Sequence, residues 1–234
     1  SVDFKTEQAL KFVSTYQRIW QDFTFEVSPY ANYIFNYIYL RPVGITKNVR
    51  GVFPYFRYTQ TDALFLGADF TGTWRAGNYL KIIPKVSLLR ASDESNHEFL
   101  VFIPSNKYEV ALRYDRAELS FFRNFYVESK TKFVAKQTRA PRVVTVREIN
   151  EAQEQHTDPF NGNTSNFDFM DAPEGYWLWN VAIGASVKSK KVQYDFRIAS
   201  ENTLNQKYRE YTNRFRYYAD DLGRNIIFSL KCIY

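Results

Sequence analysis

Apolar and polar side chains alternate along most of this chain. In residues 23–39 the odd positions hold apolar and mostly aromatic residues, Tyr37 and Tyr39 among them, and the even positions are mostly polar. A two-residue period places successive side chains on opposite faces of a β-strand. The run exceeds the five or six residues that are usual for a globular strand. It therefore predicts a long strand with one apolar and one polar face.

Eight further segments show the same period, some with more noise. They are residues 8–20, 64–74, 79–91, 108–114, 121–138, 176–189, 191–199 and 226–234. Helical periodicity does not recur between them. The pattern therefore predicts an all-β, antiparallel fold with about nine strands, and the chain ends on the last of them at Tyr234.

The predicted connections alternate between short and long. The short ones are residues 19–22, 75–78, 115–118 and 189–191, and the long ones are residues 41–62, 92–107, 139–175 and 201–222. This alternation places every long loop at one rim, and loops longer than about 12 to 15 residues are commonly functional. Long two-faced strands with such rims are typical of a transmembrane β-barrel, in which every backbone group pairs between strands. The alternative is a soluble β-sandwich, which favours shorter strands and an aliphatic inner face.

In a barrel the two rows of side chains have different environments. We expect the apolar row, with Tyr37 and Tyr39, to face lipid. Aromatic residues near strand ends would form the interfacial girdles, namely Trp20, Trp74, Trp177, Trp179 and Tyr234. The polar row would face the lumen through Glu26, Asn32, Asn36, Glu109, Arg113, Asp195 and Arg197.

Composition narrows the class of protein. The 234 residues are 18% aromatic with a mean hydropathy of −0.44, and no run approaches the roughly 18 apolar residues of a spanning helix. Cys232, the single cysteine, excludes an intramolecular disulfide. The formal net charge of +6 is scattered without a nucleic-acid motif, so we expect no nucleic-acid partner. Because the chain opens on Ser1, we expect a processed or partial chain.

The sequence lacks the common catalytic motifs, so we expect no enzyme activity and no cofactor. His97 and His156 fall in predicted long loops, where we expect solvated side chains rather than metal ligands. One loop is rich in oxygen donors, at Asp158, Asn161, Asn163, Asp168 and Asp171. Their spacing does not match a calcium-binding EF-hand, and we expect an ordinary surface loop with no metal, calcium being the alternative.

The C-terminal segment, residues 201–234, resembles the C-terminal signature of TonB-dependent outer-membrane receptors, especially those of Bacteroidetes. The matching positions are Asn202, Leu204, Asn205, Tyr208, Arg214, Tyr217, Gly223, Arg224, Asn225 and Tyr234. Residues 28–42, 56–70 and 101–115 resemble three further stretches of that family, in the same order. Three departures are small, namely Leu222 in place of proline, Tyr234 in place of phenylalanine and Thr203 in place of an aliphatic residue. The large departure is that the plug domain and the TonB-contacting segment implied by the family are not found in these 234 residues.

The resemblance implies a barrel of the 22-stranded type that encloses a plug domain. Residues 1–234 would be a partial barrel domain, about nine C-terminal strands with long extracellular loops and no plug. An odd number of strands is unusual for a bacterial barrel, and an open sheet would leave unpaired edges in lipid. We therefore expect the remaining N-terminal barrel and plug, on another chain or a missing part, to complete it. Closure would involve Arg224, Asn225 and Tyr234.

The function implied by the resemblance is active uptake of a scarce nutrient across the bacterial outer membrane, with an iron–siderophore complex the commonest substrate. Haem, cobalamin and oligosaccharides stay open. The implied partners are the TonB complex through the plug, outer-membrane lipid and lipopolysaccharide, and a small-molecule chelate. The alternative is a structural or interaction barrel of an outer-membrane assembly without transport of its own, and a soluble carbohydrate-binding sandwich is a distant third.

Aromatic and arginine side chains in the long loops are the candidate ligand contacts. Aromatic faces give rigid apolar contact, and guanidinium groups bind anionic oxygens. The candidates are Tyr55, Arg57, Tyr58, His97, Phe99, Phe160, Phe167, Arg214, Arg216 and Tyr217.

Overall fold

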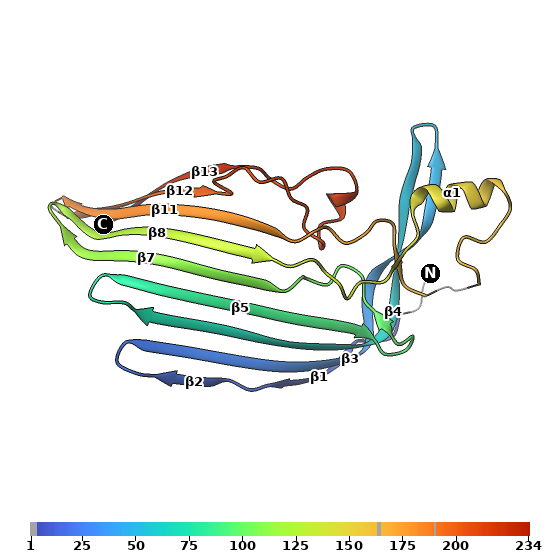
Figure 1. The fold of residues 1–234 in the computed structure, drawn as a ribbon, viewed down its shortest axis with the longest axis horizontal. Helices are drawn as coiled ribbons and strands as arrows, with labels where there is room; N and C mark the ends of the chain where they lie inside the picture. Colours follow the sequence, from blue (N-terminus) through green and yellow to red (C-terminus); the bar gives the residue numbers. More distant parts are fainter. Residues whose placement is uncertain (1–3, 163–164, 190) are drawn as a thin grey trace.

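A computed structural model describes residues 4–162, 165–189 and 191–234 and shows one large antiparallel sheet (Figure 1). Its strands are β1 (Gln8–Val13), β2 (Tyr16–Ile19), β3 (Phe23–Asn48), β4 (Gly51–Arg75), β5 (Leu80–Asp93), β6 (Glu98–Phe99), β7 (Lys107–Leu119), β8 (Phe122–Val134), β11 (Tyr176–Ser189), β12 (Val192–Glu201) and β13 (Asn225–Ile233). Outside it lie the short strands β9 (Arg142–Val143) and β10 (Phe167–Asp168), the helix α1 (Val146–Glu154) and the 3-10 helix η1 (Arg214–Tyr217).

Neighbouring strands in the sheet follow the order of the chain. The order is β1-β3-β4-β5-β7-β8-β11-β12-β13, with β2 also beside β3 and β6 beside β5. The nine strands of this path agree with the predicted number. Within the described residues β1 and β13 do not pair with each other, so the sheet is open. The prediction of an all-β, antiparallel, partial barrel is therefore confirmed.

The two faces of the sheet differ in the way that the alternation predicts. The outer face carries exposed apolar side chains on strand after strand, such as Leu112, Trp177, Ile198 and Phe228. The inner face carries the polar rows, with a hollow of ≈ 590 Å³ beside Ser28 and Asn32. On this face the ring of Tyr30 lies directly over Gly67. A side chain at position 67 would clash with it, because an added Cβ would be 2.2 Å from the Tyr30 ring.

A β-bulge in β3 corrects the predicted facing of three residues. The register with β4 shifts between Ile34 and Tyr37, which moves the following side chains to the other face. Tyr37 and Tyr39 therefore turn to the inner side, where Tyr39 is buried, and not to lipid. Asn36 lies in the bulge at φ 55° and its side chain donates to the Thr6 carbonyl, so Asn36 does not continue the row of Asn32.

The long connections gather at one end of the sheet and the short turns at the other (Figure 1). Two predicted boundaries were wrong. The predicted loop 41–62 is a β-hairpin, because β3 and β4 continue pairing as far as Asn48 and Gly51. The turn predicted at 115–118 lies at residues 120–121, where β7 gives way to β8. Lys190, in the last predicted short turn, lies outside the described residues.

The hairpin of β3 and β4 extends beyond the rest of the sheet. We call residues 36–62 the mouth arm, because β1 pairs with β3 only up to Phe35 and β5 pairs with β4 only from Ala63. In Figure 1 the mouth arm rises from the end of the sheet where the long loops lie, with α1 beside it. No helix in the described ranges is long and apolar enough to cross a membrane.

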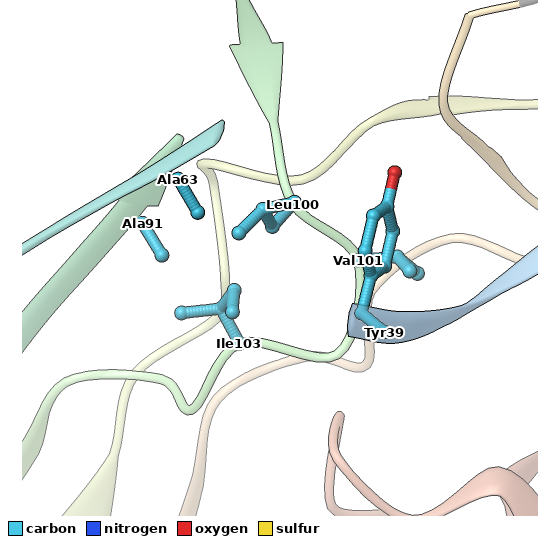
Figure 2. Packing of buried hydrophobic residues seen from close by; sticks show 6 residues of the cluster. All are labelled: Tyr39, Ala63, Ala91, Leu100, Val101 and Ile103. Atoms are coloured by element: carbon cyan, nitrogen blue, oxygen red, sulfur yellow. The ribbon is translucent and has the colours of Figure 1, made fainter. Parts of the chain in front are cut away.

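The long loops fold back over the inner face and bury apolar side chains there. Leu100, Val101 and Ile103, from the connection after β6, pack against Tyr39 and two small residues of the sheet. Figure 2 shows these two, Ala63 of β4 and Ala91 of β5, beside Leu100. A second cluster joins Val144, Ile149, Phe167 and Phe169 of residues 142–169 to the mouth arm. We call residues 94–106, 135–162, 165–175 and 202–224, which lie over the inner face or beside the mouth arm, the loop layer.

Candidate functional site

The loop layer is anchored by Asp93, at the end of β5. Its side chain is fully buried, and its carboxylate accepts five hydrogen bonds from neighbouring segments. The donors are Thr61 Oγ1 at 2.5 Å, Ser95 N at 3.1 Å, Asn96 N at 3.0 Å, Asn96 Nδ2 at 2.9 Å and Asn166 Nδ2 at 3.1 Å. Asn166 also accepts from the Tyr39 hydroxyl at 2.7 Å. One carboxylate thus joins the mouth arm, the turn after β5 and residues 135–175.

A second buried group joins two long loops to each other. Arg216 of η1 is 0% exposed and forms an ion pair with Asp168 of β10, and it donates to the Asp171 carbonyl at 3.2 Å. The Tyr217 hydroxyl donates to Asp168 Oδ1 at 2.6 Å. The guanidinium lies 4.9 Å and 4.7 Å from the rings of Tyr211 and Tyr217. We call Asp168, Arg216 and Tyr217 the loop lock.

Burial and charge set the protonation states within the loop lock. Burial raises the pKa of Asp168, while Arg216 and the hydrogen bond from Tyr217 act in the opposite direction. Burial, followed by the nearby Asp168 carboxylate, raises the pKa of Tyr217. Tyr217 therefore keeps its proton and remains a hydrogen-bond donor to Asp168.

A cavity of ≈ 410 Å³ opens beside the loop lock. The mouth arm, α1 and η1 each contribute to it, and its walls include Val52, Pro54, Val146, Arg147, Met170 and Tyr218. Apolar and aromatic walls with few charged groups are typical of small-molecule sites. We call this space the mouth cavity.

The structure separates the sequence-predicted ligand residues into exposed and buried groups. Tyr55, Arg57 and Tyr58 lie exposed on the mouth arm, with His97 and Arg214 exposed elsewhere in the loop layer. Phe99 lies in β6 with Arg90 5.5 Å from its ring. Phe160 and Phe167 pack together with a centroid distance of 5.1 Å, and Phe167 and Arg216 are buried. Tyr217 lines the mouth cavity from the loop lock.

Sequence reasoning missed α1 and the residues around it. Residues 139–175 were predicted as one loop, although Thr145 begins a helix there. The Thr145 hydroxyl accepts from Glu148 N at 3.2 Å, and the Glu148 carboxylate accepts from Thr145 N at 2.7 Å. This is a capping box, and its T-x-x-E spacing was a readable signal. Arg147 and Tyr218 of the mouth cavity had no such signal, because loop packing alone brings them together.

The oxygen-rich loop does not assemble as a calcium site in the described residues. Asp158 accepts from the backbone of Phe160 at 2.8 Å and of Gly162 at 2.5 Å, whereas Asp168 belongs to the loop lock. Asn163 lies outside the described residues. No group of three or more His, Cys, Asp or Glu side chains suited to a metal ion occurs in residues 4–162, 165–189 and 191–234.

The inner face below the loop layer carries charged side chains in two groups. The first, on β5, β7 and β8, consists of Lys81, Arg113, Asp115 and Glu128. Its ion pairs are Lys81–Asp115 at 3.0 Å, Arg113–Asp115 at 2.8 Å and Arg113–Glu128 at 3.2 Å. The second group surrounds Glu109 and consists of Lys85, Lys107, Lys130 and Lys132.

The other predicted lumen and closure residues lie as follows. Arg197 and Asp195 of β12 line an inner hollow with Arg113, and Glu26 is the register partner of Thr71 on the inner row. Arg224 N donates to Asn205 Oδ1 at 2.9 Å and Arg224 Nε to the Thr203 carbonyl at 2.8 Å. Asn225 begins β13 as the partner of Glu201. Tyr234 ends the chain 97% exposed.

Comparison with known proteins identifies the fold. No family model matches the chain, and no curated protein matches it. Among solved structures, the copper transporter OprC matches with a TM-score of 0.69 at 16% identity, over 98% of this chain and 31% of its own. The siderophore receptor PirA from Acinetobacter baumannii matches with 0.64 at 15%, over 97% and 32%. The FrpB iron transporter from Neisseria meningitidis matches with 0.63 at 12%, over 98% and 31%.

These structural neighbours are TonB-dependent receptors, which are outer-membrane proteins. This chain has the fold of part of their barrel, as expected for the C-terminal portion of such a receptor. It spans about a third of the length of the solved structures that it matches. The neighbours are transporters and receptors rather than enzymes.

Proposed function

We propose that this chain is the C-terminal barrel portion of a TonB-dependent receptor that takes up a scarce nutrient through the bacterial outer membrane. One observation carries the proposal: an open sheet with an apolar outer face has long loops folded over its polar inner face, and they leave a cavity at the mouth.

An iron–siderophore complex is the leading substrate class. The names of the matched structures support nutrient uptake, since they include an iron transporter and a siderophore receptor as well as a copper transporter. A cavity of ≈ 410 Å³ lies in the range of roughly 300 to 1,000 Å³ that is usual for small-molecule sites. Its aromatic and arginine side chains suit an aromatic, anionic chelate.

The proposed contacts are the accessible side chains at the mouth. Tyr218 and Arg147 line the mouth cavity, and Tyr55, Arg57 and Tyr58 are exposed on the mouth arm outside it. Arg216 and Phe167 are buried, so their proposed role is to hold the loops that present these contacts. None of Tyr55, Arg57, Tyr58, His97, Phe99, Phe160 and Arg214 lines the mouth cavity, so all seven rank below Tyr218 and Arg147 as proposed contacts.

The proposed partners complete the barrel. The edges of β1 and β13 have backbone groups that lipid cannot satisfy, so they would pair with further barrel strands. A plug within that barrel would connect to the TonB complex. The apolar outer face would contact lipid and lipopolysaccharide.

The test uses the complete receptor in its own outer membrane. We expect deletion of its gene to abolish energy-dependent uptake of a radiolabelled iron–siderophore complex under iron limitation. The double variant R147A/Y218A should weaken binding by about tenfold, the loss of roughly 1.4 kcal/mol of aromatic and charged contact. The control R123A alters an exposed arginine of β8 at the opposite end of the sheet and should bind normally.

Two results would contradict the proposal. Unchanged uptake after deletion, for iron complexes and for copper, haem, cobalamin and oligosaccharide alike, would favour a structural barrel without transport. Normal binding by R147A/Y218A in a receptor that does transport would remove the mouth cavity as the ligand site.

A further inference from the structure

Four lysines surround one glutamate on the inner face of β5, β7 and β8. We call Lys85, Lys107, Lys130 and Lys132 the lysine patch. Lys85, Glu109 and Lys132 are register partners in one row across the three strands. Lys107 lies two residues before Glu109 on the same strand, and Lys130 lies two residues before Lys132. Lys85 and Lys132 are therefore each about 5 Å from Glu109, and Lys107 is diagonal to both lysines at roughly 7 to 8 Å.

The carboxylates near the lysine patch do not balance its charge. A hollow of ≈ 480 Å³ is lined by all four lysines but only two carboxylates, Asp69 and Glu109. Glu109 is paired with Lys130 at 3.7 Å, and Lys107 is paired with Glu210 of the loop layer at 3.0 Å. Within the described residues no ion pair involves Lys85 or Lys132.

The neighbouring charged group shows that this imbalance is not forced by the sheet. Lys81, Arg113, Asp115 and Glu128 lie on the same three strands and are fully paired at 3.2 Å or less. The same geometry thus accommodates complete pairing a few residues away. Lys107 lies diagonal to both Lys85 and Lys132 in the register, so the three like charges repel one another. Lys132 is also half-buried, which adds a desolvation cost to its charge. The excess positive charge therefore favours binding of an anionic group.

We propose that the lysine patch is an anion-binding site for carboxylate or phosphate groups on the inner wall of the barrel. The hollow has room for a group bearing two or more negative charges, and Lys85 and Lys132 flank it with free ammonium groups. Two sources can supply this chemistry: a small anionic solute in the lumen, or acidic side chains of a protein segment seated there. The inference rests on the proposed function only in that the inner face must line an enclosed lumen.

Lysine reactivity in the complete, detergent-purified receptor tests the proposal. Acetylation of each lysine with a water-soluble reagent is followed by mass spectrometry, with citrate or inorganic phosphate as the probe. For a free solute site, probe at ten times its dissociation constant should slow acetylation of Lys85 and Lys132 about tenfold. Lys11, on the inner face outside the lysine patch, should change less than about twofold.

Two matched double variants distinguish binding at the lysine patch from a general effect of the protein's positive charge. K85Q/K132Q should abolish protection of Lys107 and Lys130 by citrate. K11Q/K231Q removes the same two charges from β1 and β13 and should leave that protection unchanged.

A carbodiimide crosslinker distinguishes the two sources, because it joins a lysine amine to a carboxylate that contacts it. If a protein segment supplies the anions, Lys85 and Lys132 should be protected without probe and crosslinked to acidic residues outside residues 1–234. If Lys85 and Lys132 react as fast as Lys11 with or without probe and form no such crosslink, the proposal is wrong. This test is independent of the uptake test. If the receptor transports but its lysine patch is not protected, the anion site is wrong and the proposed function stands. If the lysine patch is protected but the receptor does not transport, the anion site stands and the proposed function is wrong.

Discussion

The loop lock and the lysine patch are both polar clusters on the inner side of the sheet, yet they are built in opposite ways. In the loop lock the Arg216 guanidinium is fully buried against the Asp168 carboxylate, and Tyr217 adds a further hydrogen bond. In the lysine patch Lys85 and Lys132 face a hollow without an ion pair in the described residues. Paired and buried groups hold loops in place, whereas unpaired and accessible groups remain available to a ligand.

Desolvation explains why the two clusters cannot exchange these roles. A buried charge that loses its partner strongly destabilises the fold, so removal of either Asp168 or Arg216 from the loop lock should be costly. A charge that still contacts water keeps most of its hydration and can remain unpaired at modest cost. Each prediction below therefore compares a polar group that has hydrogen-bond or ion-pair partners with a matched control.

The largest effect should follow from breaking the loop lock. In R216L the buried Asp168 loses its counter-ion, and we expect residues 142–171 to lose about 3 to 5 kcal/mol of local stability. Hydrogen exchange of these residues in the complete receptor measures the loss. R214L is the matched control, since Arg214 is exposed two positions away and should change stability by less than about 0.5 kcal/mol. Equal effects of the two variants would show that Arg216 does not anchor the loops.

A smaller effect should follow from altering the Asp93 anchor. In D93N an amide NH2 replaces one carboxylate oxygen and faces hydrogen-bond donors such as Thr61 Oγ1 and Asn96 N, which then have no acceptor. We expect the free energy of unfolding to fall by about 1 to 3 kcal/mol. The turn at residues 94–97 should become sensitive to limited proteolysis. E94Q is the control, because the Glu94 carboxylate accepts from the hydroxyl of Ser92, two residues away on the same segment. A proteolysis pattern like that of the unaltered receptor would contradict the anchor.

The cap of α1 should contribute less. T145A removes the hydroxyl that accepts from Glu148 N, at a cost of about 1 kcal/mol to the helix. Hydrogen bonds from the Thr145 backbone and hydroxyl lower the pKa of Glu148. The capping contribution is therefore complete above the pKa of the unfolded carboxyl and is lost as the pH falls through the lower, folded pKa. Helix amide exchange that is equally slow in T145A and T46A, an exposed threonine of the mouth arm, would contradict this prediction.

The fold was largely readable from the sequence because each strand carries its own signal. The odd positions 177–187 are all apolar, and the strand there, Tyr176–Ser189, has the predicted bounds. A β-bulge reverses which face the following residues occupy, and alternation in the sequence does not reveal it. The inward direction of Tyr37 and Tyr39 was therefore not predicted. Residues 41–62 of the mouth arm were predicted as a loop, although β3 and β4 continue through them, Pro42 and Pro54 included.

The loop layer was not readable, because it depends on contacts between segments far apart in sequence. Arg216 and Asp168 are 48 residues apart, and nothing local marks either as buried. Both were predicted from residue type alone, Arg216 as a ligand contact and Asp168 as a possible calcium ligand. Their burial distinguishes an arginine that holds loops together from one that is free to meet a ligand, such as Arg57 on the mouth arm.

The smallest effect on stability should come from the lysine patch itself. K85Q/K132Q removes two cations that lack ion pairs and that repel their neighbours, so in citrate-free buffer we expect a change within about 0.5 kcal/mol, or a slight gain. Thermal unfolding of the purified receptor measures it. K81Q is the control, because its loss leaves Asp115 with Arg113 as its remaining ion-pair partner and should destabilise more. If K85Q/K132Q lowered the stability more than K81Q does, Lys85 and Lys132 would have a stabilising partner. The contrast with the loop lock would then be wrong.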